Sequence, residues 1–344
     1  MNIRKISEAS GYIYMNGRFQ EGSISHLHGE CIFSPGETGI KNFGTLIPLP
    51  VNAHTHIGDS FVRDEPMGDL PAVVGPDGFK VRKFREASED EIYSGMKRSI
   101  SFMKQNGTGS FIDFRESGLR GASLIRSIKS SGIGKVILGR PETTEEAKKI
   151  LKFAQGVNFS AVSDVNYDNI SRIAQIAHDY GKIVAIHFSE NVREDLDLIM
   201  GIKPDLLIHG IEASDHDLKT LKNSGIPVAI TPRSNYFFGK RPDYSVFLKS
   251  SINLLLGTDN AMISEPDIFS EMSFLYRVQR SINRISPDEI LKMVIDAPYS
   301  FLKKNNIDVD NSRYIYFPGR RVTAYEIVSR FHTLDRSIVE ISAV

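Results

Sequence analysis

The sequence has very little of the chemistry that cross-links small extracellular proteins. Its 344 residues include one cysteine, Cys31, and no tryptophan. A single thiol excludes an intrachain disulfide framework, and it excludes every zinc site that needs two or more cysteines, including the deaminase design in which paired cysteines hold the metal. We therefore expect a reduced, cytoplasmic protein whose metal ligands, if it has any, are other side chains.

An excess of charge of one sign is also missing. The 42 lysines and arginines balance 42 aspartates and glutamates, which gives a formal net charge of +0. A balanced chain lacks the basic footprint of a nucleic-acid binder and the polybasic patch of a membrane-surface protein. No uncharged apolar run is long enough to span a bilayer, and residues 1–20 lack the apolar core of a signal peptide. We expect no nucleic-acid or membrane partner, and a small-molecule substrate instead.

What the chain does contain is a regular alternation of short apolar runs and longer amphipathic segments. This pattern is typical of βα units around a parallel sheet. Eight such runs can be counted, and eight is the number that closes a (β/α)8 TIM barrel. The runs are 45–56, 107–116, 134–142, 157–165, 182–190, 205–212, 227–235 and 253–261. We predict an α/β fold with the barrel over residues 48–309.

Helix starts are marked between several of these runs. Ser88, Thr143 and Ser286 each stand three residues before a glutamate, which is the spacing of a capping box. Each of these serines or threonines is followed by a helical apolar period. The spacing predicts that a helix begins directly after each of them.

The two ends of the chain differ from the middle. Residues 11–34 alternate apolar and polar side chains around an Asn-Gly turn, which is a strong hairpin signal. Residues 313–344 show a similar but less regular alternation. Neither end is long enough to bury a core alone. We therefore predict a small composite β-sandwich domain beside the barrel, built from residues 1–47 and 310–344.

The first run ends in two histidines with one residue between them. His54 and His56 share one face of a strand because side chains two residues apart point the same way, so together they could grip one metal ion. An isolated pair of this kind is more often a polar strand end. His26 and His28 have the same spacing, but they lie in the flanking hairpin with no carboxylate partner downstream, and we interpret them as part of a surface strand.

Other predicted strand ends decide between these interpretations. His187 and Glu190 end the fifth run, His209 ends the sixth and Asp259 ends the eighth, and functional groups of a barrel gather at the carboxyl ends of its strands. With the two histidines of the first run, His187 and Asp259 form a nitrogen-rich shell suited to zinc or ferrous iron, with room for a water. Glu190 and His209 remain as acid/base groups. Without a cation to share, the ionisable groups of such a cluster would repel one another or stay buried and unpaired. The other histidines, in helices and in the small domain, are His178, His216 and His332.

The order of "HTH", "HFSE", "HG", "TPRSN" and "GTDN" resembles the amidohydrolase superfamily, within its cytosine deaminase, adenosylhomocysteine deaminase and triazine chlorohydrolase branch. The resemblance runs from about residue 10 to the end of the chain. It implies a proton shuttle at Glu190, with His209 and Asp259 as catalytic groups that orient the water. The metal ligands that it implies are His54, His56, His187 and Asp259.

The resemblance also bears on the number and kind of metal ions. Binuclear members carry a bridging lysine on the fourth strand, but the fourth run, 157–165, contains no lysine. We therefore expect one divalent metal ion per chain, with zinc favoured and iron or manganese as alternatives. Relatives often have Cys-Pro where this chain has Thr231-Pro232, and we expect little consequence from that difference.

Specificity is expected from the other strand ends and from the long loop after the first run, which could cover the pocket. Arg115 and Glu116 are adjacent and could read a polar heterocycle or a carboxylate tail. Each candidate could equally form a salt bridge at the rim or cap a loop. The candidates for substrate binding are Arg115, Glu116, Arg140, Asp164, Arg233, Asn235 and Asn260.

These observations predict a metal-dependent hydrolase acting on carbon-nitrogen bonds other than peptide bonds, most simply one that deaminates a pyrimidine, purine or pterin-like ring. Hydrolytic opening of a cyclic amide, as in imidazolonepropionase, would use the same residues and stays open. A non-catalytic scaffold would be expected to show a broken ligand set, whereas the set here is intact. Barrel enzymes of this sort often form closed oligomers, so a homo-oligomer is expected, although no residue pattern specifies it.

Overall fold

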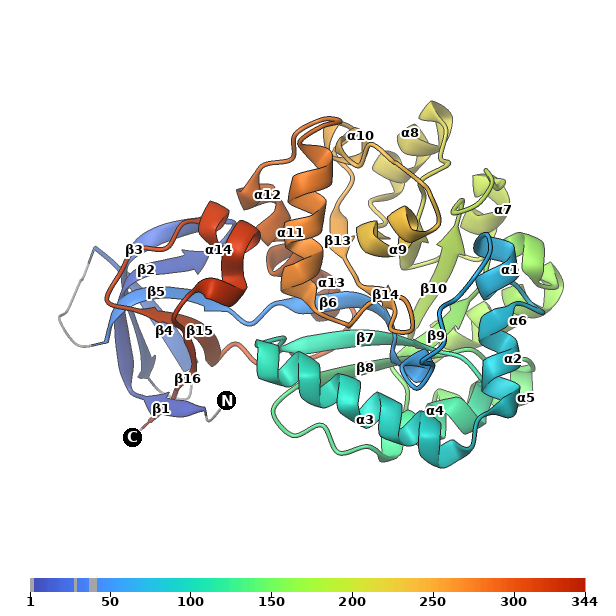
Figure 1. The fold of residues 1–344 in the computed structure, drawn as a ribbon, viewed down its shortest axis with the longest axis horizontal. Coiled ribbons are helices and arrows are strands. Elements are labelled where there is room, and N and C mark those ends of the chain that lie inside the picture. Colours follow the sequence, from blue (N-terminus) through green and yellow to red (C-terminus); the bar gives the residue numbers. More distant parts are fainter. Residues whose placement is uncertain (1–2, 28–29, 37–41, 344) are drawn as a thin grey trace.

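The computed structural model describes residues 3–27, 30–36 and 42–343, which form two separate sheets (Figure 1). One sheet curls into a barrel of parallel strands wrapped by helices. The other is a mixed sheet built from both ends of the chain, and it lies on the left of Figure 1 beside the two termini. Among the described residues, no helix is both long enough and apolar enough to cross a bilayer.

The barrel strands follow the order of the sequence around the sheet. The eighth strand is interrupted at Gly257 and Thr258, so that β13 pairs with β12 on one side and β14 pairs with β6 on the other. The barrel is thereby closed, and each of the eight predicted runs supplies one of its strands. The strands are β6 (Val51–His56), β7 (Ser110–Arg115), β8 (Gly134–Gly139), β9 (Gly156–Phe159), β10 (Ile183–Phe188), β11 (Leu206–His209), β12 (Val228–Ile230), β13 (Leu254–Leu256) and β14 (Asp259–Asn260).

The first run is one strand in the prediction and two strands in the structure. Strand β5 (Phe43–Pro48) pairs with the flanking strands β2 (Glu8–Met15) and β15 (Arg313–Pro318), and only β6 belongs to the barrel. The break falls at Pro48 and Pro50, which lack the N–H that a continuous ladder requires. Our proposed domain division, at 47/48 and 309/310, falls next to this break and between α13 and β15.

Helices cover the outside of the barrel. Ser88 and Ser286 form complete capping boxes, as predicted. Thr143 caps its helix through the N–H of Glu146, but the Glu146 carboxylate binds the N–H of Leu119 instead of completing the box. The helices are α1 (Leu70–Val74), α2 (Phe79–Glu86), α3 (Glu89–Asn106), α4 (Gly118–Ser127), α5 (Thr144–Ile150), α6 (Tyr167–Asp179), α7 (Leu196–Gly201), α8 (Asp215–Ser224), α9 (Pro232–Phe237), α10 (Ser245–Lys249), α11 (Ile268–Gln279), α12 (Pro287–Val294) and α13 (Asp296–Lys304), with 3-10 turns η1 (Ile57–Asp59) and η2 (Val162–Asp164).

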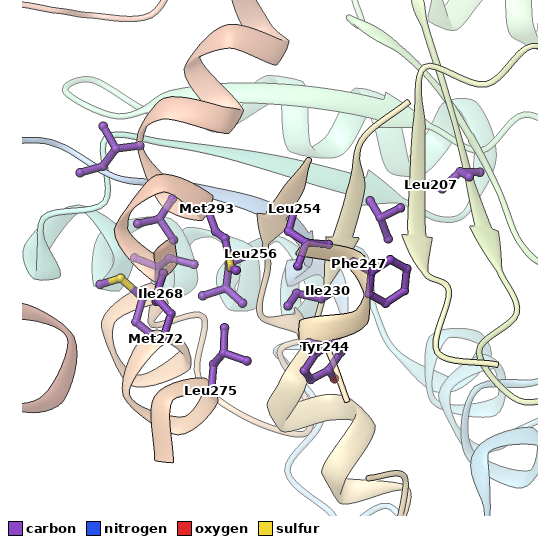
Figure 2. Close-up of a cluster of buried hydrophobic side chains, with 14 of the residues drawn as sticks. Leu207, Ile230, Tyr244, Phe247, Leu254, Leu256, Ile268, Met272, Leu275 and Met293 are labelled. Atoms are coloured by element: carbon purple, nitrogen blue, oxygen red, sulfur yellow. The ribbon is translucent and has the colours of Figure 1, made fainter. Parts of the chain in front are cut away.

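Two apolar layers hold the barrel together. Within β10, Ile183 and Ala185 belong to the cluster inside the barrel, while Val184 and Ile186 belong to the layer between strands and helices, as the two-residue period of a strand requires. His187 continues the inner row. Figure 2 shows part of the outer layer, where strand residues meet α11 and α12. These residues include Ile230, Leu254, Leu256, Ile268, Met272, Leu275 and Met293.

The flanking sheet confirms the predicted hairpin and corrects the carboxyl end. Strands β2 and β3 join at the Asn16-Gly17 turn, and the sheet folds over itself so that the Cys31 Sγ in β4 lies 3.6 Å from the Ile341 carbonyl oxygen in β16. Between β15 and β16 the chain does not continue the predicted alternation but forms a helix, α14, which begins with a Thr323–Glu326 capping box. The elements are β1 (Arg4–Ile6), β2 (Glu8–Met15), β3 (Arg18–Leu27), β4 (Glu30–Pro35), β15 (Arg313–Pro318), α14 (Ala324–Arg330), η3 (Phe331–Thr333) and β16 (Ser337–Ile341).

Candidate active site

Four histidines and one aspartate meet at the carboxyl ends of the barrel strands. His54 and His56 come from β6, His187 from β10, His209 from β11 and Asp259 from β14. The Nε2 atom of His54 lies 3.3 Å from Asp259 Oδ1. The Nε2 atom of His56 lies 3.4 Å from His187 Nε2 and 3.6 Å from the same Asp259 oxygen. The possible metal ligands form two groups, His54 with His56 and His187, and His54 with His209 and Asp259. Within each group the ligand atoms lie within 4.8 Å of one another.

Unusual backbone conformations aim two of these side chains. His209 has a φ of 69° and Asp259 a φ of 62°, in the left-handed region that few residues other than glycine adopt. Ile208 points into the barrel, so regular alternation would turn His209 outward, and the change in φ brings it back. Gly257 lies against His54, where an added Cβ would stand 2.5 Å from the His54 Cβ. Such local strain is typical of functional sites that the surrounding structure holds in place.

Contacts at Nδ1 leave the Nε2 lone pairs of two histidines free for a metal. The Nδ1 of His187 donates to the Phe159 carbonyl at 2.8 Å, and the Nδ1 of His56 lies 2.6 Å from the Glu116 carboxylate. Burial lowers the pKa of His187 well below its usual value, and burial together with the Lys80 charge lowers the pKa of His56 to about 3. Both rings are therefore neutral, as metal ligation requires.

The remaining ligand atoms complete a donor set for a divalent cation. The Nδ1 of His54 is buried and has no hydrogen-bond partner among the described residues. Burial alone would raise the pKa of Asp259, but the neighbouring histidines, His54 first, hold it well below the usual range, so the group is a carboxylate. Three imidazoles and one carboxylate fit a transition metal such as zinc. The residues present therefore fit a metal centre.

Glu190 and His209 form an acid/base pair beside this cluster. The Oε2 atom of Glu190 lies 3.3 Å from the Nε2 atom of His209. Burial, followed by the negative charge of Asp259, raises the pKa of Glu190 well above its usual value. Glu190 belongs to neither group of ligand atoms. A buried carboxyl with a raised pKa that is not a ligand is suited to proton transfer.

A chain of side chains behind His209 selects its tautomer. The hydroxyl of Tyr244 donates to Asn235 Oδ1 at 2.8 Å, which turns the Asn235 Nδ2 toward the His209 Nδ1 at 3.4 Å. The Thr231 hydroxyl lies 3.1 Å from the same nitrogen. Burial lowers the pKa of His209 to about 3, so its ring is neutral. With Nδ1 accepting, the single proton lies on Nε2 and points toward Glu190 and the metal cluster.

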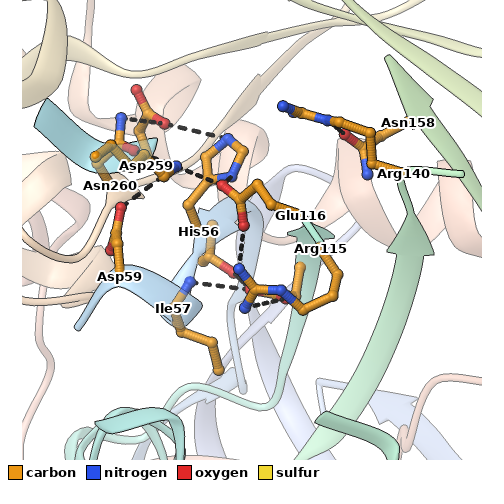
Figure 3. A network of polar contacts seen from close by, with 12 residues as sticks. His56, Ile57, Asp59, Arg115, Glu116, Arg140, Asn158, Asp259 and Asn260 are labelled. Carbon is orange, nitrogen blue, oxygen red and sulfur yellow. Dashed lines mark hydrogen bonds and ion pairs between the residues drawn. The ribbon is translucent and has the colours of Figure 1, made fainter. Parts of the chain in front are cut away.

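A group of buried charges supports His56 from behind (Figure 3). Glu116, directly after β7, lies against the Nδ1 of His56 and pairs with both Arg115 and Lys80. Arg115 also reaches Asp113 Oδ2 at 3.3 Å. Burial opposes ionisation of Glu116, but Lys80, His56 and Arg115 outweigh it and hold the pKa of Glu116 well below its usual value. A carboxylate that binds the free nitrogen of a ligand histidine fixes the orientation of its ring.

Sequence analysis missed three members of this network. Asp113 stands two residues before Arg115, a spacing that could have revealed their contact. Asp59 lies three residues after His56 and accepts from the Met262 N–H at 3.0 Å. Lys80 comes from helix α2, and no spacing rule relates the middle of a long loop to a strand end.

A cavity of about 190 Å³ opens in front of the cluster. The loop after β6 covers it, because Leu70, Pro71 and Val74 form its apolar wall. Arg140 borders the polar side, and its Nε donates to Asn158 Oδ1 at 2.8 Å. Among the described residues, the remaining guanidinium N–H groups of Arg140 have no hydrogen-bond partner.

The candidates for substrate binding divide into two sets. Those that border the cavity are Arg140, Asp164 and Asn260. Those set back from it are Arg115, Glu116, Arg233 and Asn235. Arg233 binds the fully buried Glu271 at 2.5 Å and Glu265 at 2.9 Å. It therefore helps to fix the segment after β12 and does not line the cavity.

The other histidines that the structure describes take no part in the cluster. His178 lies at the end of α6, His216 in the first turn of α8 and His332 in the flanking region, where it binds Asp267 at 2.8 Å. His26 lies on β3 opposite Cys31. His28, its predicted companion on a surface strand, lies outside the described residues.

Residues 45–296, most of the chain and all of the cluster, match the model of the amidohydrolase family. The chain belongs to the amidohydrolase family. This result confirms the resemblance that the sequence motifs indicated, and with it the barrel fold and the assignment to hydrolases of carbon-nitrogen bonds.

Three proteins illustrate what this chain is similar to in sequence and in structure. An uncharacterised protein of Methanocaldococcus jannaschii is 33% identical over 292 residues, which are 77% of this chain and 75% of the relative. The 5-methylthioadenosine/S-adenosylhomocysteine deaminase of Pyrococcus abyssi is 26% identical over 294 residues, 72% of this chain and 67% of the deaminase. The crystal structure of guanine deaminase from C. acetobutylicum, with bound guanine, superposes with a TM-score of 0.77 at 15% identity, covering 97% of this chain and 98% of that one. At this identity, the structural likeness shows the fold alone.

Proposed function

We propose that this amidohydrolase deaminates an aminated nitrogen heterocycle, a pyrimidine, purine or pterin-like ring. The observation that carries the proposal is the position of Glu190, whose carboxyl lies 3.3 Å from His209 and outside both ligand groups. An amine is a poor leaving group until it is protonated, so deamination needs a residue that can move protons at this point. The deaminase name of the relative from Pyrococcus abyssi supports the same reaction.

The proposal includes one divalent cation per chain. Its ligands are His54, His56, His187 and Asp259, and this nitrogen-rich set favours zinc, with iron or manganese as alternatives. The fourth run, 157–165, has no lysine that could bridge a second ion. When bound, the cation supplies Lewis acidity and lowers the pKa of a water molecule.

Glu190 carries the protons in the proposed reaction. It accepts one proton from the attacking water and delivers it to the ring nitrogen next to the aminated carbon. The carbon is then tetrahedral, and it bears a hydroxyl and the amine. The hydroxyl proton passes through Glu190 to the amine, the carbon-nitrogen bond breaks, and ammonia leaves behind a ring carbonyl. His209 donates its Nε2–H to the attacking oxygen, and Asp259 accepts from the same water.

The other predicted residues have two proposed roles. Arg140, Asp164 and Asn260 contact the ring, because they border the cavity. Arg115 and Glu116 hold His56 from behind, and Asn235 sets the tautomer of His209. Arg233 fixes the segment that carries Asn235. The small cavity, about 190 Å³, suits one ring system with few substituents.

The alternatives are separated by their chemistry. Opening of a cyclic amide would use the same catalytic residues, but it releases no ammonia. A non-catalytic scaffold is disfavoured by the complete ligand set. We further propose a cytoplasmic protein without nucleic-acid partners, since its charge is balanced and it has one cysteine, and a homo-oligomer, since closed symmetry is common among such enzymes.

Ammonia release tests the proposed function. Protein loaded separately with zinc, iron or manganese would be incubated with aminated pyrimidines, purines, pterins and triazines, while the ultraviolet absorbance of each ring is followed. We expect ammonia and a spectral shift for at least one ring. Silence across the panel from fully loaded protein, together with turnover of an imidazolone or a lactam, would replace deamination with ring opening.

A further inference from the structure

Lys80 is unusually buried for a lysine. It is the second residue of α2, in the loop that covers the cavity, and only 6% of its surface is exposed. Lysine is rarely buried to this extent unless it is paired. Its Nζ pairs with Glu116, lies 2.8 Å from Asn260 Oδ1 and lies 3.4 Å from Asp59 Oδ2. The ammonium therefore donates a hydrogen bond to Asn260 and forms ion pairs with Glu116 and Asp59.

Two of these partners each contact one residue of the metal cluster. Glu116 Oε1 lies 2.6 Å from the His56 Nδ1, and Asn260 Nδ2 donates to the Asp259 Oδ1 at 3.1 Å. Because Lys80 binds the Asn260 oxygen, the Asn260 amide nitrogen is turned toward Asp259. A single ammonium thus acts through one residue on His56 in β6 and through another on Asp259 in β14.

The third partner of Lys80, Asp59, joins the covering loop to the segment after β14. Asp59, in the turn directly after β6, also accepts from the Met262 N–H at 3.0 Å in the segment after β14. The covering loop, residues 57–88, is therefore fastened by Lys80 to the ends of both strands. Leu70, Pro71 and Val74 of the same loop form the apolar wall of the cavity.

We propose that Lys80 is a positioning residue for the metal centre, which holds Glu116 and Asn260 in the orientations that aim His56 and Asp259 and so couples closure of the covering loop to metal binding. The inference rests on the proposed metal site but not on the reaction. Coupling is reciprocal, so a bound metal stabilises the closed loop to the same degree as the closed loop strengthens metal binding.

Metal affinity measured without substrate tests this role. Zinc dissociation constants would be determined by competition with a chromophoric chelator for wild type, K80M, K80R and K83M. Lys83 is the matched control, since it lies on the same helix but pairs with Asp64 at the surface. We expect K80M to bind zinc about 10–100-fold more weakly. K83M should stay within about threefold of wild type.

The conservative variant adds a readout that separates charge from geometry. Arginine keeps the positive charge, but its guanidinium N–H groups lie in one plane, unlike the three N–H groups of an ammonium. K80R should therefore recover part of the zinc affinity that K80M loses. Should K80M fail to fold, as judged by thermal unfolding, K80Q takes its place with the same expectation. Equal zinc affinity in K80M and K83M would overturn the proposal.

Hydrogen exchange of the loop tests the coupling itself. Zinc loading of wild type should slow amide exchange in residues 70–86, and K80M should lose this effect even at saturating zinc. Equal protection in both proteins would contradict the coupling. Absence of zinc binding by wild type would remove the metal site and this inference together, whereas failure to find a deaminated substrate would leave the inference intact.

Discussion

The Glu190 Oε2 lies 3.3 Å from the Nε2 of His209, and Glu190 belongs to neither group of possible metal ligands. Proton transfer and metal binding are therefore assigned to different side chains that share one cavity. This separation allows proton transfer to be removed while the metal stays bound.

Replacing Glu190 should abolish turnover and spare the metal. The E190Q variant keeps the size of the side chain but cannot carry a proton, so we expect kcat to fall about 10²–10⁴-fold. Bound metal, measured by elemental analysis, should equal that of wild type. The control is E212Q, which removes a carboxylate that pairs with Lys240 at 2.7 Å outside the cluster. Full turnover in E190Q would assign the proton shuttle to another group.

Replacing a proposed ligand should remove the metal as well as turnover. The H187N variant loses the Nε2 atom that faces His56 at 3.4 Å, and we expect the purified protein to contain little metal and to show no turnover. H216N, at an exposed position in the first turn of α8, should retain both. Removal of the metal from wild type with a chelator should abolish turnover, and added zinc should restore it. Unchanged metal content in H187N would contradict the proposed ligand set.

Arg140 should affect substrate binding more than the chemical step. Its guanidinium borders the cavity and uses only Nε, toward Asn158, among the described residues. In R140M the substrate would lose a charged donor, worth about 1.5–3 kcal/mol, so KM should rise about tenfold or more. The change in kcat should be smaller. R120K, at an arginine that pairs with Glu89 on the surface, should leave KM unchanged. A loss confined to kcat would move Arg140 from binding to catalysis.

One buried carboxylate predicts how stability varies with pH. Asp267 caps α11 and binds His332 at 2.8 Å. Burial opposes its ionisation, but His332, Ser270 and the Phe269 N–H outweigh burial and lower the pKa of Asp267 below its ordinary value of 3.8. The ionised group therefore stabilises the folded state above pH 3.8, and this stabilisation is lost as the pH falls through the lower, folded-state pKa.

The D267N variant isolates this contribution, because asparagine can still cap the helix. Urea unfolding near neutral pH should show wild type to be about 1–2 kcal/mol more stable than D267N. The difference should shrink as the pH is lowered below about 4. A difference that does not depend on pH would assign the effect to packing rather than to charge.

Much of this architecture could be predicted because a closed barrel brings its strand ends together. Once the eight runs are read as barrel strands, His54, His187 and Asp259 must approach one another, whatever the loops do. The conformations that turn His209 and Asp259 inward, however, depend on a positive φ that alternation alone does not reveal.

Other features depend on contacts between distant segments. Lys80 reaches the cluster from a helix within a long loop, and no local pattern fixes where such a helix packs. The break between β5 and β6 was missed because apolar residues continue through Pro48 and Pro50, although the two prolines could have indicated it. Helix α14 was not predicted because apolar and polar residues alternate over residues 313–344. The capping box that begins at Thr323 indicates the helix.

The most direct test of the central claim is the nitrogen balance of the first substrate that the metal-loaded protein turns over. Mass spectrometry of the product and an ammonia assay would be run on the same sample. Deamination predicts one ammonia per product and an intact ring in which oxygen replaces the amino group. A product that has gained water, retained every nitrogen and lost its ring would contradict the account and establish a cyclic amide hydrolase.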